Sequence, residues 1–381
     1  MIPLSTIRIA RPALAAFAAM GVVWGSFAAE LPDLKAMLNV DEQQLGLLMF
    51  LTPIAAVLAM LAAPWAGLAL GKVALPVVTF VMAAAFLLPG HATTVWLFPL
   101  AMLACGAGTG MTDVLMTARV AAMENDRGLH LMNLSHAAYS FGYAGGALVT
   151  GALRMAGWSP ACVLSSMALL AAVLALAAFE ANGTIHGLTT PKDRAAGRLG
   201  LLPIIGGGIV LIAFLTENAA ENWSALHIEK TLGGSPADGA AGPAVMALTM
   251  GIARLVGQSL AQRVPAVWLL TGGAILSACG AVAAAAADSP AMAYAGFIIM
   301  GTGSSVIAPT AFSLIGQKAA PAARARAVAR ATLLGYFGYF FGPPLIGLIA
   351  GQFGLRFAFV FAGGVLLSVP VLAQVIARQR S

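Results

Sequence analysis

The sequence predicts an all-α membrane protein in which twelve transmembrane helices form two pseudo-symmetric six-helix bundles. Three observations carry this prediction: the composition, twelve apolar stretches of membrane-spanning length, and a weak repeat between the two halves of the chain. Apolar residues make up 60% of the 381 residues and charged residues 9%, and the mean hydropathy is +0.91. Soluble domains carry about 25% charged residues, so this composition cannot cover a water-exposed surface.

The apolar stretches give the predicted helices in order. A bilayer core of about 30 Å needs about 20 apolar residues per helix, and short loops between the stretches leave no room for a soluble catalytic domain. In the first half the predicted spans are 12–31, 45–70, 72–88, 95–122, 131–153 and 162–179. In the second half they are 201–227, 242–261, 267–287, 291–315, 327–350 and 357–376.

A long polar connection halfway along the chain predicts the domain organisation. It contains Pro191, Lys192, Asp193 and Arg194, which are typical of a linker. We therefore expect an N-terminal six-helix bundle at 1–181, a cytoplasmic linker at 182–199 and a C-terminal six-helix bundle at 200–381.

The two halves share short motifs under a nearly constant shift. The matched segments are Gly108-Thr109-Gly110 with Gly301-Thr302-Gly303, and Phe141-Gly142-Tyr143 with Phe337-Gly338-Tyr339. A parallel repeat of six helices is the plan of membrane proteins that work by rocking one half against the other.

The basic residues predict the orientation. An even number of spans puts both termini on one side, and three of the 20 Lys and Arg residues, Arg119, Arg254 and Arg330, lie within spans or at their ends. If the termini are cytoplasmic, only four of the others fall outside: Lys35, Arg154, Lys230 and Arg356. Positive charge favours the cytoplasmic side, so we expect a multi-pass protein of the inner membrane with both termini inside. The net charge of +6 reflects this topology and does not indicate nucleic-acid binding.

Cofactor and enzyme motifs are absent from the sequence. It has no phosphate-binding Gly-Lys-Ser/Thr loop, no dinucleotide-binding glycine fingerprint, no zinc-type His and Cys spacing, and no nucleophile and base at plausible spacing. Cys105, Cys162 and Cys279 lie in or beside predicted spans and favour packing over a disulfide or metal site. We expect no cofactor and no enzymatic activity, so that energy for any function comes from an ion gradient or from a solute gradient.

Several motifs together carry a family resemblance. Residues 217–224 read ENAAENWS, residues 110–113 read GMTD, residues 135–142 read SHAAYSFG, and 254–258 read RLVGQ with Arg263 beyond. The first resembles the E-G-x-x-x-D-W-S segment of the fucose-permease-like branch of the major facilitator superfamily, and the last resembles the superfamily's R-x-x-G-D-x-x-x-x-R loop. Gln258 stands where that loop has an acid. The resemblance implies an alternating-access permease of sugars or small metabolites.

Carboxylates inside the spans are candidates for proton coupling. Ionisable groups in hydrocarbon cost several kcal/mol, so they usually face a hydrated cavity or a partner. Glu217 and Glu221 lie four residues apart on one helix face, and Asp113 lies within the fourth predicted span. We expect all three to carry protonation, with two alternatives: the glutamates cap a helix end at the interface, or Asp113 forms a structural pair with Arg119 or His136.

Other residues of the spans are expected to contact solute or to support the structure. Tyr and Trp offer a flat apolar face with a polar group, which suits a sugar, a heterocycle or another small amphiphile, although the same residues also form belts at membrane interfaces. The predicted solute contacts are Trp223, Asn218, Asn222, Tyr139, Tyr336 and Trp24. The predicted structural or gating residues are His136, Arg119, Arg254 and Arg330, with the arginines anchoring helix ends and an inner gate.

The resulting functional hypothesis is a secondary active transporter, a proton-coupled symporter of a small polar or amphiphilic solute such as a sugar. The expected partners are that solute, protons and the lipid bilayer, without nucleic acid, and the expected state is a monomer. Two alternatives stay open at this point. The chain could be a drug or metabolite exporter that works as an antiporter, or a membrane receptor that no longer transports.

Overall fold

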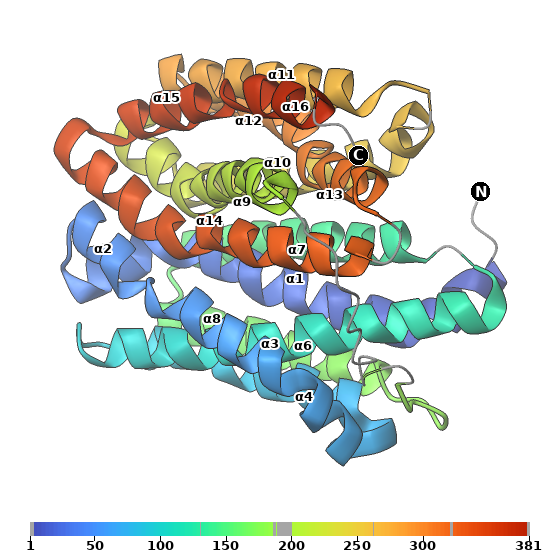
Figure 1. Ribbon diagram of the computed structural model, residues 1–381. Coiled ribbons are helices and arrows are strands. Elements are labelled where there is room, and N and C mark those ends of the chain that lie inside the picture. Colours follow the sequence, from blue (N-terminus) through green and yellow to red (C-terminus); the bar gives the residue numbers. More distant parts are fainter. Residues whose placement is uncertain are drawn as a thin grey trace.

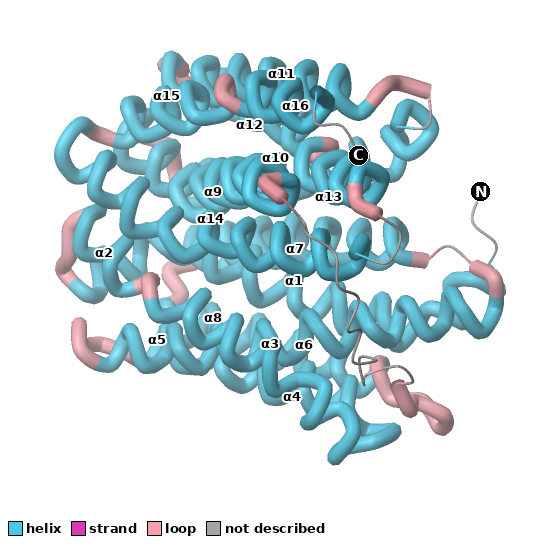
Figure 2. The backbone as a smooth tube through the Cα atoms, viewed as in Figure 1, coloured by secondary structure: helices cyan, strands magenta, loops and turns pink. Residues whose placement is uncertain are grey.

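The computed structural model describes residues 4–129, 131–185, 188, 200–261, 263–320 and 323–378. Helices dominate these residues, and no strand occurs among them (Figures 1 and 2). The predicted all-α class is confirmed. The predicted linker 182–199 falls mostly outside the described residues, and the boundaries of the two bundles stay a prediction.

The helices follow the predicted spans in order. The first half contains α1 (Leu4–Leu38), α2 (Glu42–Leu48), α3 (Leu51–Leu70), η1 (Gly71–Val73), α4 (Ala74–Ala85), α5 (Leu88–His91), α6 (Leu97–Arg127), α7 (Met132–Met155) and α8 (Pro160–Ala177). The second half contains α9 (Leu202–Leu226), η2 (His227–Thr231), α10 (Pro236–Ala261), α11 (Ala266–Ala286), α12 (Pro290–Ser304), α13 (Ile307–Lys318), α14 (Arg324–Phe353), α15 (Leu355–Leu366) and α16 (Val369–Arg378).

Membrane-spanning length is met by nine helical segments within the described residues. One of them, Glu42–His91, covers two predicted spans. Its 50 residues are enough for two crossings, since about 20 residues cross a bilayer. The helices α7 and α10 are not among the nine but coincide with two further predicted spans. Large apolar side chains that face outward from α3, such as Leu61 and Trp65, are more than 70% exposed, as a lipid-facing surface requires.

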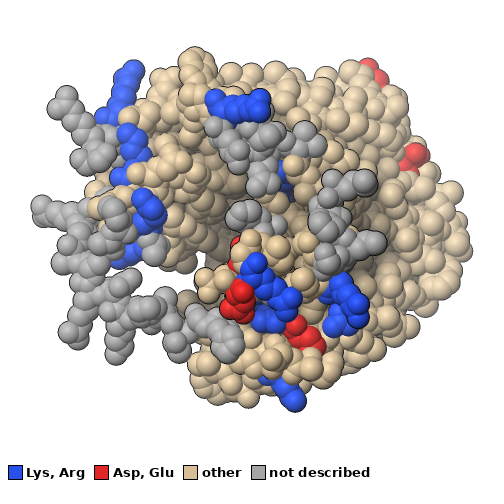
Figure 3. Space-filling model, turned by 90° about the vertical axis from the view of Figure 1, so that its right-hand side faces the viewer, with Lys and Arg blue, Asp and Glu red and all other residues tan. Residues whose placement is uncertain are grey.

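The two ends of the bundle differ in character. The first turn of α1 and the last turn of α16 lie at the same end, on the right in Figure 1, which we call the termini face. Lys and Arg side chains gather on this face (Figure 3). The opposite end carries α2 and the junction of α14 with α15, and we call it the far face.

Equivalent glycines of the sequence repeat make the same kind of close helix contact in both halves. A β-carbon at Gly142 of α7 would collide with the carbonyl oxygen of Ala18 on α1, and one at Gly338 of α14 would collide with that of Leu211 on α9. Gly142 and Gly338 are the central residues of the matched Phe-Gly-Tyr segments. Small residues permit such close approach between membrane helices, so each segment serves the same packing role in its half.

A substitution at Gly146 tests this packing. We expect Gly146→Val to destabilise the protein by at least about 1–3 kcal/mol, because its side chain would collide with the backbone of Val22 on α1. Gly145→Val is the matched control, since nothing lies within 4 Å of a β-carbon at this neighbouring position. The melting temperatures of the two purified variants in detergent give the answer. Equal melting temperatures would contradict the packing described here.

Several contacts between the two halves lie at the far face. A β-carbon at Gly46 of α2 would meet the carbonyl oxygen of Pro343 on α14, and one at Gly347 would lie 2.6 Å from that of Glu42. Arg154, at the end of α7, binds Glu229 of η2 through its Nη1, 2.7 Å from Glu229 Oε1. The far face is therefore closed by both packing and charge.

The buried position of Arg154 corrects a sequence-based expectation. The sequence places Arg154 in an outer loop, but its side chain has no exposed surface and also binds Asp33 of α1, with Nη2 2.8 Å from Oδ1. Glu30 of α1 is also fully buried, 4.0 Å from the same guanidinium. A charge at a helix end can be covered by a neighbouring helix, which hydropathy does not reveal.

Candidate functional site

A cavity of about 720 Å³ lies between the two halves. Its walls come from α1, α3, α6 and α7 of the first half and from α9, α10, α13 and α14 of the second. Its lining extends toward the termini face, where Asn133 stands in the first turn of α7 and Arg254 in the last turns of α10. The far-face contacts cap the other end.

Three of the predicted spans are each interrupted by a break between two helices, and two of these breaks lie beside the cavity. The predicted span 45–70 is divided into α2 and α3, the span 291–315 into α12 and α13, and the span 357–376 into α15 and α16. Met49, at the first break, and Ser305 and Val306, at the second, line the cavity. Non-helical backbone within a membrane is tolerated where it is covered by protein or lines a cavity, which fits the first two breaks.

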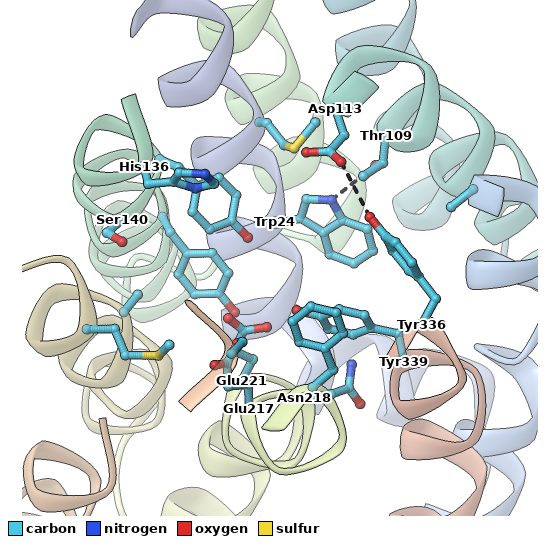
Figure 4. A pocket seen from close by; sticks show the side chains of 18 of the residues that line it. Trp24, Thr109, Asp113, His136, Ser140, Glu217, Asn218, Glu221, Tyr336 and Tyr339 are labelled. Carbon is cyan, nitrogen blue, oxygen red and sulfur yellow. Dashed lines mark hydrogen bonds between the residues drawn. The ribbon is translucent and has the colours of Figure 1, made fainter. Parts of the chain in front are cut away.

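Most of the predicted site residues line the cavity. They are Asp113, Glu217, Glu221, Asn218, Asn222, Tyr139, Tyr336, Trp24, His136 and Arg254. Figure 4 shows Asp113 reaching in from α6 on one side, and Glu217 and Glu221 reaching in from α9 on another. The lining thus brings together residues that lie more than 200 positions apart in the sequence.

Trp223 does not line the cavity, and its prediction as a solute contact is corrected. The lining residues of α9 follow the spacing of a single helix face: Phe214, Glu217, Asn218, Glu221 and Asn222. Trp223 lies outside this stripe, is fully buried, and packs close to Gly347 of α14. It therefore contributes to helix packing.

The three predicted arginines have different surroundings. Arg119 does not pair with Asp113 but donates to Glu180 from Nε at 2.6 Å and to the carbonyl oxygens of Thr184 and Asn182 at 3.3 Å. It holds the chain segment that follows α8. Arg330 is exposed on α14 and is not among the lining residues.

Arg254, predicted to anchor a helix end and an inner gate, lies in the cavity wall. Its Nη2 lies 3.7 Å from Glu217 Oε1. This distance permits an ion pair but no direct hydrogen bond, and Glu217 Oε1 has no hydrogen-bond partner among the described residues. The pair is loose, so Glu217 is only partly neutralised by the protein.

A polar contact joins the halves across the cavity. The hydroxyl of Tyr336 on α14 donates to Asp113 Oδ2 on α6 at 3.5 Å (Figure 4). The Asp113 carboxylate therefore lies where the two halves meet, and its one polar partner among the described residues belongs to the other half. A change in its charge would act directly on the contact between halves.

Aromatic rings form much of the remaining wall. Trp24 donates from Nε1 to the hydroxyl of Thr109 at 3.1 Å, which fixes the indole in the wall. Tyr139 and Tyr143 of α7 lie 5.9 Å apart between ring centroids, and Tyr339 stacks on Phe214 at 4.7 Å. His136 also lines the cavity, where its ring packs edge-on against Phe17 of α1.

The cavity lining also includes residues that are not among the predicted site residues. Two of them are Thr109, which belongs to the repeated Gly-Thr-Gly motif, and Asn133. Asn133 stands three residues before His136 on one helix face, so the helical spacing could have found it. Thr109 could have been found in the same way, four residues before Asp113.

Comparisons with known proteins agree with this architecture. The sequence model of the Major Facilitator Superfamily matches residues 206–380. The chain is 30% identical over 372 residues to an uncharacterised MFS-type transporter of Yersinia pestis, and the match covers 95% of this chain and 94% of the relative. It is 24% identical over 353 residues to membrane protein MosC of Rhizobium meliloti, covering 91% of this chain and 86% of MosC.

Solved structures show the same fold at low sequence identity. A D-xylose-proton symporter matches with a TM-score of 0.75 at 13% identity, covering 99% of this chain and 98% of that one. The nucleoside transporter NupG matches with a TM-score of 0.74 at 14% identity, covering 98% and 100%. At such identities the likeness extends to the fold alone.

Proposed function

We propose that this chain, which belongs to the major facilitator superfamily, is a secondary transporter that carries a small polar or amphiphilic solute by alternating access, coupled to protons. The observation that carries the proposal is the cavity between the halves, which holds three carboxylates and the Asp113–Tyr336 contact. A carboxylate placed where the two halves meet can bind a proton from one side and release it to the other, because rocking changes which side has access to it.

The described contacts correspond to one state of the proposed cycle. The far face is closed by the Arg154–Glu229 ion pair and by α2 against α14, while the cavity extends toward the termini face. Following the positive-inside rule, we place the termini face in the cytoplasm and the protein in the inner membrane. In that orientation the structure is inward-facing, and the complete transporter is a monomer.

The narrower resemblance to fucose-permease-like transporters supports a solute with polar groups. Glu217, Asn218, Glu221 and Asn222 of the ENAAENWS segment all line the cavity. The Oδ1 atom of Asn218 is buried without a hydrogen-bond partner in the described part of the chain. Such a group is available to a solute and is costly to leave unpaired.

Transport by purified protein in liposomes tests the proposed function. Internal pH is followed with a trapped dye while candidate sugars, nucleosides, amines and organic acids are added outside. We expect at least one solute to move protons, and its accumulation to depend on an imposed pH gradient. Accumulation that does not depend on the pH gradient would contradict the proposed proton coupling. Saturable binding without any flux would instead support a receptor.

A further inference from the structure

The cavity wall holds more acidic than basic side chains. Among the described lining residues, the carboxylates are Asp113, Glu217 and Glu221, and the guanidinium of Arg254 is the one permanent cation. Arg254 lies 3.7 Å from Glu217, so it is already associated with one of the three acids. If all three acids are ionised, the cavity keeps an excess of negative charge that a solute or protons must balance.

Glu221 is the carboxylate with the weakest protein support. It has no hydrogen bond and no ion pair with any described residue, whereas Asp113 accepts from Tyr336 and Glu217 lies near Arg254. It stands one turn from Glu217 on the same face of α9, and both reach into the cavity in Figure 4. The titratable groups that share the cavity with it are Glu217, Arg254, Asp113, His136, Tyr139, Tyr143, Tyr336 and Tyr339.

Unpartnered polar atoms beside Glu221 point to a ligand independently of the charge count. Glu217 is 4% exposed and Asn218 is 8% exposed, and each has a side-chain oxygen without a partner in the described structure. All of these free oxygens are hydrogen-bond acceptors. A solute that satisfies them must bring donors, as a protonated amine does.

Aromatic rings around these acceptors suit a positive charge as well. Tyr139, Tyr143 and Tyr339 come from α7 and α14 and line the same cavity as Glu221. The faces of aromatic rings attract organic cations, and more strongly where water is excluded. The volume of about 720 Å³ is within the range of sites for small organic molecules.

We infer that the transported solute is a small organic cation, a protonated amine on a ring-shaped or apolar body, whose charge takes the place of a proton at Glu221. This inference rests on the proposed function for its site but names the solute class and the group it replaces. Since a cation and a proton then neutralise the same carboxylate, they bind in competition. The coupling is an exchange of the two across the membrane.

Binding to the purified protein in detergent tests this inference without requiring transport. The probes are two matched pairs, phenethylamine with 2-phenylethanol and glucosamine with glucose. The readout is the melting temperature over a concentration series. We expect at least one cation to raise the melting temperature and its neutral partner to have no comparable effect. Glu221→Gln should weaken the binding of the cation at least about tenfold, because a charge-assisted contact is lost.

Two controls separate charge from folding. Glu42→Gln removes a half-buried carboxylate of the far face, outside the cavity, and should bind as the unmodified protein does. In the unmodified protein, acidification should weaken cation binding. This measurement does not depend on the folding of any variant. The inference is overturned if no cation binds, if the neutral partners bind equally well, or if cation binding ignores both pH and Glu221→Gln. Transport of a neutral or anionic solute in liposomes would contradict this inference but would still support the proposed function.

Discussion

Asparagine in place of Asp113 is expected to abolish proton-driven accumulation of the solute while sparing exchange of solute for solute. A gradient of one pH unit is worth about 1.4 kcal/mol per proton, enough for about tenfold accumulation, so the variant should fall to equal concentrations inside and outside. Exchange should persist because an amide can still accept from Tyr336 and keep the contact between halves. Radiolabelled uptake and counterflow in liposomes measure the two activities separately.

Asp126→Asn is the matched control for this substitution. Asp126 lies on the same helix, α6, but is exposed and outside the cavity. It should accumulate solute as the unmodified protein does. If Asp113→Asn also accumulates solute normally, the Asp113 carboxylate has a structural role and does not carry a coupling proton.

Glutamine in place of Glu229 is expected to open the far face. The substitution removes the ion pair that joins η2 to α7 but leaves Arg154 bound to Asp33 and to the carbonyl oxygen of Ala29, so no charge is stranded. A hydrogen bond to a charged group contributes about 1.5–3 kcal/mol, and about 1.4 kcal/mol shifts a two-state population tenfold. Labelling of Asn222→Cys by a membrane-impermeant maleimide from the far side should therefore accelerate at least about tenfold.

Two comparison variants define what this result means. Lys35→Gln breaks the ion pair with Glu42, which is also at the far face but lies within the first half, and should leave the labelling rate unchanged. Arg154→Gln would leave Glu30, Asp33 and Glu229 without their shared cation, so we expect poor folding there. An unchanged rate in Glu229→Gln would mean that packing alone closes the far face.

Much of the fold could be predicted because lipid imposes simple rules. All twelve predicted spans overlap helices of the structure, since each needs a long apolar stretch and carries few charges. The breaks at Met49 and at Ser305 were not predicted, because the residues there remain apolar or small and hydropathy does not change. They depend on the cavity beside them, which only the assembled bundle creates.

The candidate site was predictable as far as single helices determine it. The acids and amides of α9 lie on one stripe, and consistent use of that spacing would have excluded Trp223. Contacts between different helices could not be predicted from the spacing of residues along one helix. The partner of Asp113 comes from α14, more than 200 residues away, and that of Arg154 from η2, and no spacing rule connects such positions.

Distances between spin labels at the two faces report most directly on whether the halves rock around the cavity. One label pair replaces Asp126 and Gln317 at the termini face, and the other replaces Thr93 and Asp288 at the far face, after Cys105, Cys162 and Cys279 are changed to alanine. On a change of pH, or on addition of a solute that binds, the termini-face distance should shorten while the far-face distance lengthens. Distances that stay fixed, or that change in the same direction at both faces, would contradict alternating access by this chain.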